Sequence, residues 1–411
     1  MAMKPILIRG ARLIDPAAGT EEVGDLLIAD RQIADVGRNL AAPADAEIVE
    51  AGGLSLAPGL IDVGVFRTDV EAAVAGGITS VLLMPDQSPP LDDPALIERA
   101  ERLGKPRLWV RPLAAATRGL NGRELAELSL MKEAGAVAVA TGRQAIADAQ
   151  VMLRLLRYAA GLDLVVIAHA ECPFLTAGAA ATDTETATRL GLPAAPASAE
   201  AIQIARDLRL AREAKAALHI ACVSTAEGTA LIRAARAEGQ DVTAGTAPAY
   251  ALLSDTALTG YRSFARLSPP LRTESDRLAV REALADGTIS VLGSRHDPRT
   301  QEDKRLPFAD AAPGAAGSAT LLALGLNLVH DGLIPLSRLL ALLSANPAGR
   351  FGLPGGTLAP GAPADLLLFD ANAPWRIDAD LLPGRAGNTP FDGLPVQGRV
   401  RLLLKGGERL A

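Results

Sequence analysis

Short apolar runs alternate with amphipathic helical patterns through the middle of the chain. Short apolar runs of this kind are typical of parallel strands that are buried on both faces. Helical periodicity follows most of the runs, for example in 199–215 and 227–237, and returns after the last run in 316–330 and 335–344. Eight strands with interleaved helices predict an α/β fold, a (β/α)8 TIM-type barrel. The eight runs are 60–66, 80–84, 107–111, 136–140, 164–168, 217–223, 241–245 and 289–293.

The two ends of the chain lack this helical pattern. Short strand patterns separated by turns occupy both of them, and together they predict one small β-sandwich assembled from the two ends. The predicted domains are therefore 1–56 as the first part of the sandwich, 57–350 as the barrel and 351–411 as the second part. The strand patterns are 6–8, 12–14, 25–28, 33–36, 364–370 and 398–407.

Length and charge narrow the class of protein. A chain of 411 residues exceeds the usual span of one core. The net charge of -6, with lysines and arginines scattered along the chain, argues against a nucleic-acid partner. The apolar run at the amino terminus is too short for a signal peptide, and no later segment has about 18 unbroken apolar residues. We therefore expect a cytoplasmic protein without a membrane partner.

The first predicted barrel strand follows Pro58-Gly59 and holds an aspartate at position 62. The stretch Leu56–Arg67 resembles the amidohydrolase superfamily, and the dihydroorotases most closely, in which Pro-Gly-hydrophobic-hydrophobic-Asp precedes a His-x-His pair that binds zinc. Gly64 and Phe66 stand at those two positions here. Neither side chain has a lone pair to give to a metal.

The other strand exits depart from the family pattern in a similar way. His169 matches a metal ligand of the family, but Cys222 stands where a second ligand histidine is expected, and Arg295 replaces the aspartate that serves as general base. Asp86 takes the position of an asparagine that helps to hold substrate, and Arg67 follows the first strand. The resemblance nevertheless covers almost the whole chain, because family motifs continue in order at 190–193, 206–208, 269–272, 346–348, 361–365 and 388–393.

These replacements predict that the zinc expected for the family has lost its ligands. A hydrolytic zinc needs about three protein ligands and an open position, and His169 alone does not supply them. The positive charge of Arg295 would also repel a divalent cation. A rebuilt site from His169, Glu171 and Cys222 is the alternative. His219 cannot join Cys222 in such a site, since strand residues three apart face opposite sides.

The resemblance then implies a function without catalysis. Without a metal cofactor or catalytic residues, the chain resembles the inactive dihydroorotase homologues that pair with aspartate carbamoyltransferase in pyrimidine biosynthesis. We expect a non-catalytic structural subunit of an oligomer. The alternatives are an active cyclic-amide hydrolase of the dihydroorotase, allantoinase or hydantoinase type with an atypical site, or a small-anion binding module. The module would use arginines near the predicted barrel mouth, unless these are solvated or paired at the surface: Arg67, Arg111, Arg143, Arg295 and Arg299.

Overall fold

The computed structural model describes residues 4–411 and contains a parallel sheet of eight strands at its centre. Neighbours along the sheet follow the order β15-β14-β13-β10-β9-β8-β7-β6, and every pairing between them is parallel. Each strand lies within or beside one of the eight predicted apolar runs. The strands are β6 (Leu60–Val65), β7 (Ile78–Leu83), β8 (Trp109–Ala115), β9 (Ala138–Ala140), β10 (Val166–Ala168), β13 (Leu218–Ile220), β14 (Val242–Thr246) and β15 (Val291–Leu292).

The two end strands of this sheet lie against each other. The backbone N–H of Phe66, just after β6, donates to the carbonyl of His296 after β15 at 2.9 Å. Gly293 is required at this seam, since a Cβ there would lie 2.4 Å from the Val63 carbonyl oxygen. Apolar side chains that include Ile61, Leu82 and Ile167 fill the interior. The sheet is therefore a nearly closed, packed barrel rather than a pore.

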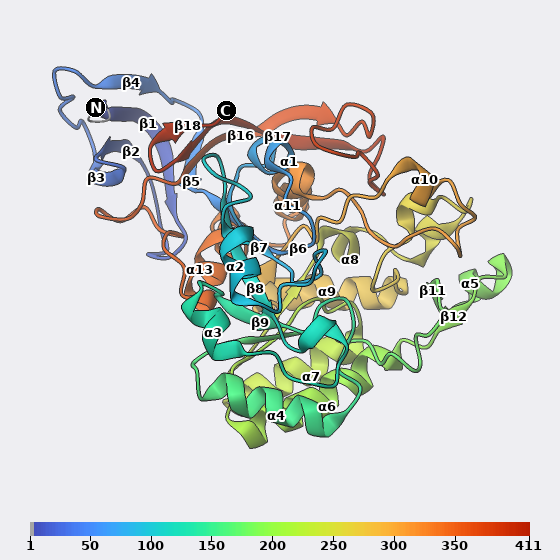
Figure 1. The fold of residues 1–411 in the computed structure, drawn as a ribbon. Coiled ribbons are helices and arrows are strands. Elements are labelled where there is room, and N and C mark those ends of the chain that lie inside the picture. The colour runs from blue at the N-terminus through green and yellow to red at the C-terminus, as the bar shows by residue number, and fades with distance from the viewer. Residues whose placement is uncertain (1–3) are drawn as a thin grey trace.

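Helices connect the strands and cover the outside of the barrel (Figure 1). The predicted helices at 199–215 and 227–237 are present as α6 and α7, so the predicted barrel fold class is confirmed. The α-helices are α1 (Val70–Ala75), α2 (Pro94–Glu101), α3 (Leu128–Glu133), α4 (Ala149–Ala160), α5 (Glu185–Leu190), α6 (Ser198–Ala214), α7 (Ala226–Ala237), α8 (Pro248–Leu252), α9 (Glu274–Asp286), α10 (Gln301–Lys304), α11 (Leu321–His330), α12 (Leu336–Leu340) and α13 (Asn346–Phe351).

The two ends of the chain share a second sheet, ordered β18-β17-β16-β5-β1-β2-β3. The sheet branches at β1, because β4 and β5 both pair with β1 in parallel. Its buried face holds a separate apolar cluster that includes Ile8, Leu26 and Leu368. Its strands are β1 (Ile6–Asp15), β2 (Thr20–Ala29), β3 (Gln32–Gly37), β4 (Glu47–Glu50), β5 (Ser55–Pro58), β16 (Leu366–Arg376), β17 (Pro395–Lys405) and β18 (Glu408–Arg409).

The domain boundaries at 56/57 and 350/351 stay predictions. Residues 1–3 of the predicted first segment lie outside the described part of the chain. Strand β5 continues two residues past the predicted boundary, to Pro58, and pairs antiparallel with β16. The turn Pro58-Gly59 thus passes directly from the terminal sheet into the barrel, and Gly59 packs against Thr79 at a distance that leaves no room for a side chain.

An excursion between β10 and α6 was not predicted from the pattern. It contains β11 (Ala181–Thr182), α5 and β12 (Ala194–Ala195), and it projects to one side of the molecule in Figure 1. Gly191 ends α5 in a left-handed conformation, and the hydroxyl of Tyr261 donates to the Leu190 carbonyl at 2.9 Å. The two strands are too short to give an apolar period.

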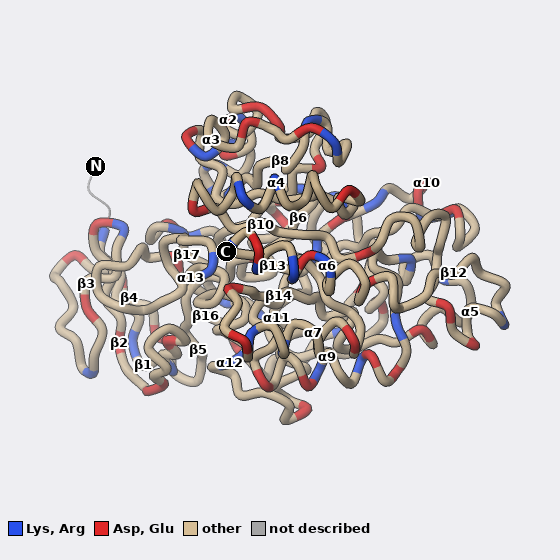
Figure 2. Tube along the Cα trace, turned by 90° about the horizontal axis from the view of Figure 1, so that it is seen from below, with Lys and Arg blue, Asp and Glu red and all other residues tan. Residues whose placement is uncertain are grey.

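Charge is spread over both parts of the molecule. Lysines and arginines alternate with aspartates and glutamates along the trace in Figure 2, without a long block of either sign. Among the described residues, no helix has the length and apolarity needed to cross a membrane.

Candidate functional site

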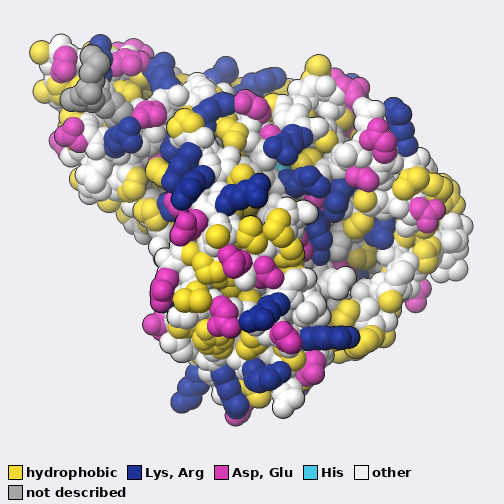
Figure 3. Space-filling view, viewed as in Figure 1, with side chains coloured by type: hydrophobic (Ala, Val, Ile, Leu, Met, Phe, Trp, Pro, Cys, Tyr) yellow, Lys and Arg dark blue, Asp and Glu magenta, His cyan; other side chains and the backbone are white. Residues whose placement is uncertain are grey.

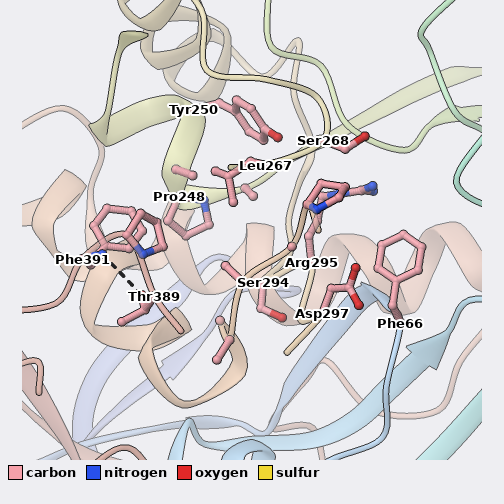
Figure 4. A pocket seen from close by; sticks show the side chains of 18 of the residues that line it. Phe66, Pro248, Tyr250, Leu267, Ser268, Ser294, Arg295, Asp297, Thr389 and Phe391 are labelled. Atoms are coloured by element: carbon pink, nitrogen blue, oxygen red, sulfur yellow. Dashed lines mark hydrogen bonds between the residues drawn. The ribbon is translucent and has the colours of Figure 1, made fainter. Parts of the chain in front are cut away.

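A pocket of about 280 Å³ opens at the carboxyl end of the barrel strands. Its walls come from the exits of β6, β14 and β15, from the loop after β9 and from the C-terminal segment 389–391. The carboxyl ends of the strands are where barrel enzymes bind their ligands. Figure 4 shows Phe66 and Asp297 on one side of the pocket, Phe391 on the other, and Arg295 between them.

The guanidinium of Arg295 lies beside Gly64 and Phe66, the two residues that stand where the family has its zinc-binding His-x-His pair. Its Nη1 lies 3.7 Å from the place of a Cβ on Gly64, and its guanidinium carbon is 5.1 Å from the centre of the Phe66 ring. That Nη1 is buried and has no hydrogen-bond partner among residues 4–411. The backbone of Arg295 has a φ of 49°, a left-handed conformation that a non-glycine residue adopts at a cost of about 1 kcal/mol or more.

Two arginines share the carboxylate beside Arg295. Asp297 accepts hydrogen bonds from Arg143 and from Arg299, with Arg143 Nη2 at 2.9 Å and Arg299 Nη2 at 2.6 Å. Arg143 also lies over the Phe66 ring, 3.9 Å from its centre. The cluster of Arg143, Arg295, Asp297 and Arg299 is therefore positive overall, with Arg295 outside the ion pairs around Asp297.

Asp86 lies behind Arg143. It accepts the backbone N–H of Arg143 at 2.8 Å, and Gly142 gives it room, since a Cβ there would lie 2.9 Å from Asp86 Oδ1. Burial raises the pKa of Asp86, although the N–H and charge of Arg143 lower it in part. Asp86 does not line the pocket and so does not face a ligand there.

A second group of polar residues lies at the exits of β10 and β13. Arg272 donates to Glu171 Oε1 at 3.0 Å and to Ser224 Oγ at 2.9 Å, and its Nη2 lies 3.6 Å from Glu200. Glu200 in turn accepts the backbone N–H groups of Ser224 and Thr225 at 3.0 and 2.9 Å. All of these side chains are buried. We call Glu171, Glu200, Ser224 and Arg272 the Arg272 network.

His169 belongs to the edge of this network. Its Nε2 lies 3.4 Å from Glu171 Oε2, and its backbone N–H donates to Thr141 Oγ1 at 2.9 Å. Burial by itself would raise the pKa of Glu171, but the contacts with His169 and the charge of Arg272 outweigh it and hold this pKa below its usual range. Glu171 is therefore a carboxylate committed to Arg272 and His169.

The remaining ligand candidates, Cys222, His219 and His296, are all buried. Burial raises the pKa of Cys222 to about 12, so its sulfur is a neutral thiol at neutral pH. His219 contacts Phe351 edge-on and bonds Thr243 through Nδ1 at 2.8 Å. His296 accepts the N–H groups of Gly317 and Ser318 at its Nδ1, 3.2 Å from each.

The donor atoms in this part of the chain do not fit the family's zinc. Within residues 4–411, no group of three or more histidine, cysteine, aspartate or glutamate side chains is placed to hold a metal ion. The space beside Gly64 and Phe66, which the resemblance assigns to the metal-binding pair, is taken by the guanidinium of Arg295. A fixed positive charge there opposes a divalent cation.

The predicted arginines separate into three groups. Arg143 and Arg295 line the pocket, and Arg299 is joined to it through Asp297. Arg67 is exposed next to the pocket. Arg111 lies elsewhere, over the Trp109 ring and within reach of the charge of Asp365 just before β16, so its expected position at the barrel mouth is wrong. Figure 3 shows basic side chains gathered beside a hollow on one face of the molecule.

Sequence reasoning missed several residues of the site. Tyr250 and Pro248 on α8 and Phe391 near the C-terminus line the pocket, and the Tyr250 hydroxyl donates to the Pro269 carbonyl at 2.6 Å. Arg272 was noted only as part of a motif. Its partner Glu171 is 101 residues away in the sequence, and no local spacing reports such a contact.

The chain is similar over nearly its full length to known proteins. It is 41% identical over 411 residues to the dihydroorotase of Syntrophotalea carbinolica and 40% identical over 409 residues to that of Pelobacter propionicus, with 96% of each chain covered in both cases. Among solved structures, the L-hydantoinase (dihydropyrimidinase) of Arthrobacter aurescens matches with a TM-score of 0.89 and 26% identity, over 100% of this chain and 96% of that one.

These relatives contradict the prediction that the chain is not an enzyme. Dihydroorotase is the name of an enzyme, and it belongs to relatives at about 40% identity whose alignments leave out only a few per cent of either chain. The physical error lay in the step from ligands to activity. The absence of the family's zinc ligands argues only against water activated by zinc. It does not show that the pocket is without catalytic activity.

The family follows from the extent of the match. The model of the Amidohydrolase family matches residues 56–410, which include the whole barrel and all three C-terminal strands. The barrel order, the pocket at the strand exits and the dihydroorotase relatives agree with this match. The chain therefore belongs to the amidohydrolase family.

Proposed function

We propose that this protein binds the compounds of the dihydroorotase reaction, dihydroorotate and carbamoyl aspartate, in the pocket at the barrel mouth. Arg295 holds a carboxylate of the ligand. The observation that carries this proposal is the buried Nη1 of Arg295, which has no hydrogen-bond partner in the described chain. An unpaired buried donor costs free energy that a ligand carboxylate would recover.

Three further features support an anionic ligand. The carboxylate of Asp297 already accepts hydrogen bonds from Arg143 and Arg299, so it does not compete with a ligand for Arg295. The left-handed backbone conformation of Arg295 sets the direction in which its side chain leaves the exit of β15. Both Arg143 and Arg295 lie over the Phe66 ring, with their guanidinium carbons 3.9 and 5.1 Å from its centre, so two positive charges are held close to the pocket.

The same arrangement defines what the pocket offers to chemistry. When water adds to the carbonyl carbon of a ring amide, negative charge develops on the carbonyl oxygen before the ring C–N bond breaks and its nitrogen takes up a proton, and a guanidinium beside that oxygen stabilises the charge. Because the relatives are named as enzymes, ring opening should be assayed in the same samples as binding. The absence of a metal from this site stays a prediction, and elemental analysis of the purified protein is its measurement.

Titration calorimetry with dihydroorotate and carbamoyl aspartate tests the proposal. We expect binding to the wild-type protein and a loss of roughly tenfold or more in affinity in Arg295→Gln, as for a charge-assisted hydrogen bond. Arg189→Gln is the control, since Arg189 is an exposed arginine on α5 and makes the same change in net charge. Absence of binding heat from both compounds in the wild type would refute the proposal.

The association with aspartate carbamoyltransferase stays a prediction that comes from the resemblance alone. Co-expression of the two chains followed by size-exclusion chromatography tests it. A joint peak with fixed stoichiometry would support the association, and separate elution at micromolar concentrations of both proteins would count against it.

A further inference from the structure

A second cavity lies beside the pocket, outside the exits of β8, β9 and β10. Its volume of about 560 Å³ is within the range of about 300–1,000 Å³ that is usual for small-molecule sites. Its walls are the loop 117–123 after β8, the loop 141–148 after β9, the first turns of α4 and residues 173–174 after β10. We call it the side cavity. Among their described lining residues, the side cavity and the pocket share Gln144 alone.

Two arginines of the side cavity have no carboxylate partner. Arg123 comes from the loop after β8 and Arg154 from α4, and both side chains are exposed. Arg157, one turn further along α4, is different because it pairs with Glu213. Within residues 4–411, no carboxylate lies within ion-pairing distance of Arg123 or Arg154. Both guanidinium groups are therefore available to an anion.

The acidic residue of the lining is already engaged. Asp148 is the N-cap of α4, and its Oδ1 accepts the N–H groups of Gln150 and Val151 at 2.7 and 3.3 Å. Two arginines and one aspartate leave the described lining with a net charge of +1.

The walls that carry these charges are fixed by hydrogen bonds. In the loop after β8, the N–H of Gly122, next to Arg123, donates to Thr117 Oγ1 at 3.0 Å. In the loop after β9, the Ile146 carbonyl accepts from Arg206 of α6 at 2.7 Å. A cavity with ordered walls loses less conformational entropy when it binds a ligand.

Phe174 gives the side cavity an aromatic surface. Its side chain is 81% exposed, although the loop that carries it is anchored. The N–H of Cys172 donates to the Ala199 carbonyl at 3.0 Å, and the N–H of Thr176 donates to the Cys172 carbonyl at 3.1 Å. An exposed aromatic ring at the edge of a cavity can stack on a planar ring of a ligand.

We propose that the side cavity binds a free nucleoside phosphate, with its phosphate on Arg123 and Arg154 and its base on Phe174. Guanidinium groups offer several N–H donors to phosphate oxygens, and every base has a flat face for stacking. A free nucleotide fits better than a nucleic acid, because the chain's net charge of -6 repels a polyanion. The inference goes beyond the proposed function and does not depend on it, since it uses neither Arg295 nor the pocket.

Titration calorimetry of the full chain with adenosine 5′-monophosphate (AMP) tests the phosphate end. We expect binding to the wild type and a loss of roughly tenfold in affinity in Arg123→Gln and in Arg154→Gln. Arg157→Gln is the matched control, since Arg157 lies outside the lining on the same helix and the change in charge is the same. Absence of binding heat in the wild type at millimolar AMP, or unchanged affinity in the first two variants, would overturn the inference.

Ribose 5-phosphate, which lacks the base, tests the aromatic end. AMP should bind about tenfold more tightly than ribose 5-phosphate, because only AMP can stack on Phe174. Phe174→Ala should remove this difference without lowering the affinity for ribose 5-phosphate. Leu381→Ala is the control, since Leu381 is 79% exposed and lies outside the lining. Equal affinities in the wild type, or a preference that persists in Phe174→Ala, would overturn the assignment to a nucleoside phosphate.

Arg295→Gln separates this inference from the proposed function. AMP affinity that is unchanged in Arg295→Gln and lowered in Arg123→Gln supports the side cavity, whatever the result with dihydroorotate. AMP affinity that falls as far in Arg295→Gln as in Arg123→Gln would place AMP in the pocket and overturn the inference.

Discussion

Two arginines at the carboxyl end of the barrel have opposite surroundings. Arg272 donates to Glu171, Ser224 and Thr182 and lies beside Glu200, so its guanidinium is surrounded by acceptors. Arg295 has a buried Nη1 without a partner among residues 4–411. The guanidinium of Arg272 thus has acceptors within the protein, whereas the Nη1 of Arg295 can still donate to a ligand. A fully paired cluster favours stability, and an incomplete one favours a ligand.

The comparison predicts the largest effect for Arg272→Met. The substitution leaves Glu171 and Glu200 buried without their cation, and breaking a buried pair in this way costs about 3–5 kcal/mol. Urea unfolding followed by circular dichroism measures the free energy of unfolding. Arg157→Met is the matched control, since Arg157 and its partner Glu213 are exposed and such a pair contributes about 0–1 kcal/mol. Equal losses in the two variants would contradict the view of the network as a structural unit.

The pH dependence of stability tests whether the carboxylate of Glu171 contributes to the Arg272 network. Its pKa in the folded protein lies below the usual 4.5, so as the pH falls below 4.5 the unfolded chain takes up a proton before the folded chain does. The stabilisation by this carboxylate is therefore present above pH 4.5 and is lost as the pH falls through the folded pKa. Glu171→Gln should unfold less steeply with acid over this range. Parallel acid-unfolding curves for wild type and variant would show that the carboxylate is not coupled to the network.

Arg295→Met should leave stability almost unchanged. The side chain gives up no hydrogen bond at Nη1, and a methionine of similar length keeps contact with Phe66, so we expect a change within about 1 kcal/mol. The same substitution at the two arginines thus separates a stability role from a ligand role. A loss at Arg295 comparable with that at Arg272 would remove the contrast on which the proposed site depends.

The sequence predicted the barrel better than the site, for a physical reason. Barrel strands are buried on both faces, so runs such as 136–140 and 164–168 are apolar throughout and visible without other information. The excursion with α5 has no such run. The departures at Gly64, Phe66 and Arg295 were visible because they stand in a recognised motif. The direction of the Arg295 side chain and the partners of Arg272 depend on residues far apart in the chain. Local sequence patterns do not predict such contacts.

The smallest effect concerns Cys222, which stands at a position that the family resemblance assigns to a metal ligand. It is buried next to the barrel mouth, and burial raises its pKa to about 12, so almost no thiolate is present at neutral pH. Because the thiolate is the reactive form, Cys222 in the folded protein should resist iodoacetamide at pH 8, whereas Cys172, which is partly exposed, should be labelled.

Mass spectrometry of tryptic peptides gives the label on each cysteine, and unfolding in urea provides the reference in which both sites react. Cys222→Ala should change neither the affinity for dihydroorotate nor the labelling of Cys172, since the thiol lies outside the pocket lining. Rapid labelling of Cys222 in the native state would mean that its thiolate is accessible. It would then be available to a metal ion or a ligand, and the functional site would extend from Arg295 toward β13 and the Arg272 network.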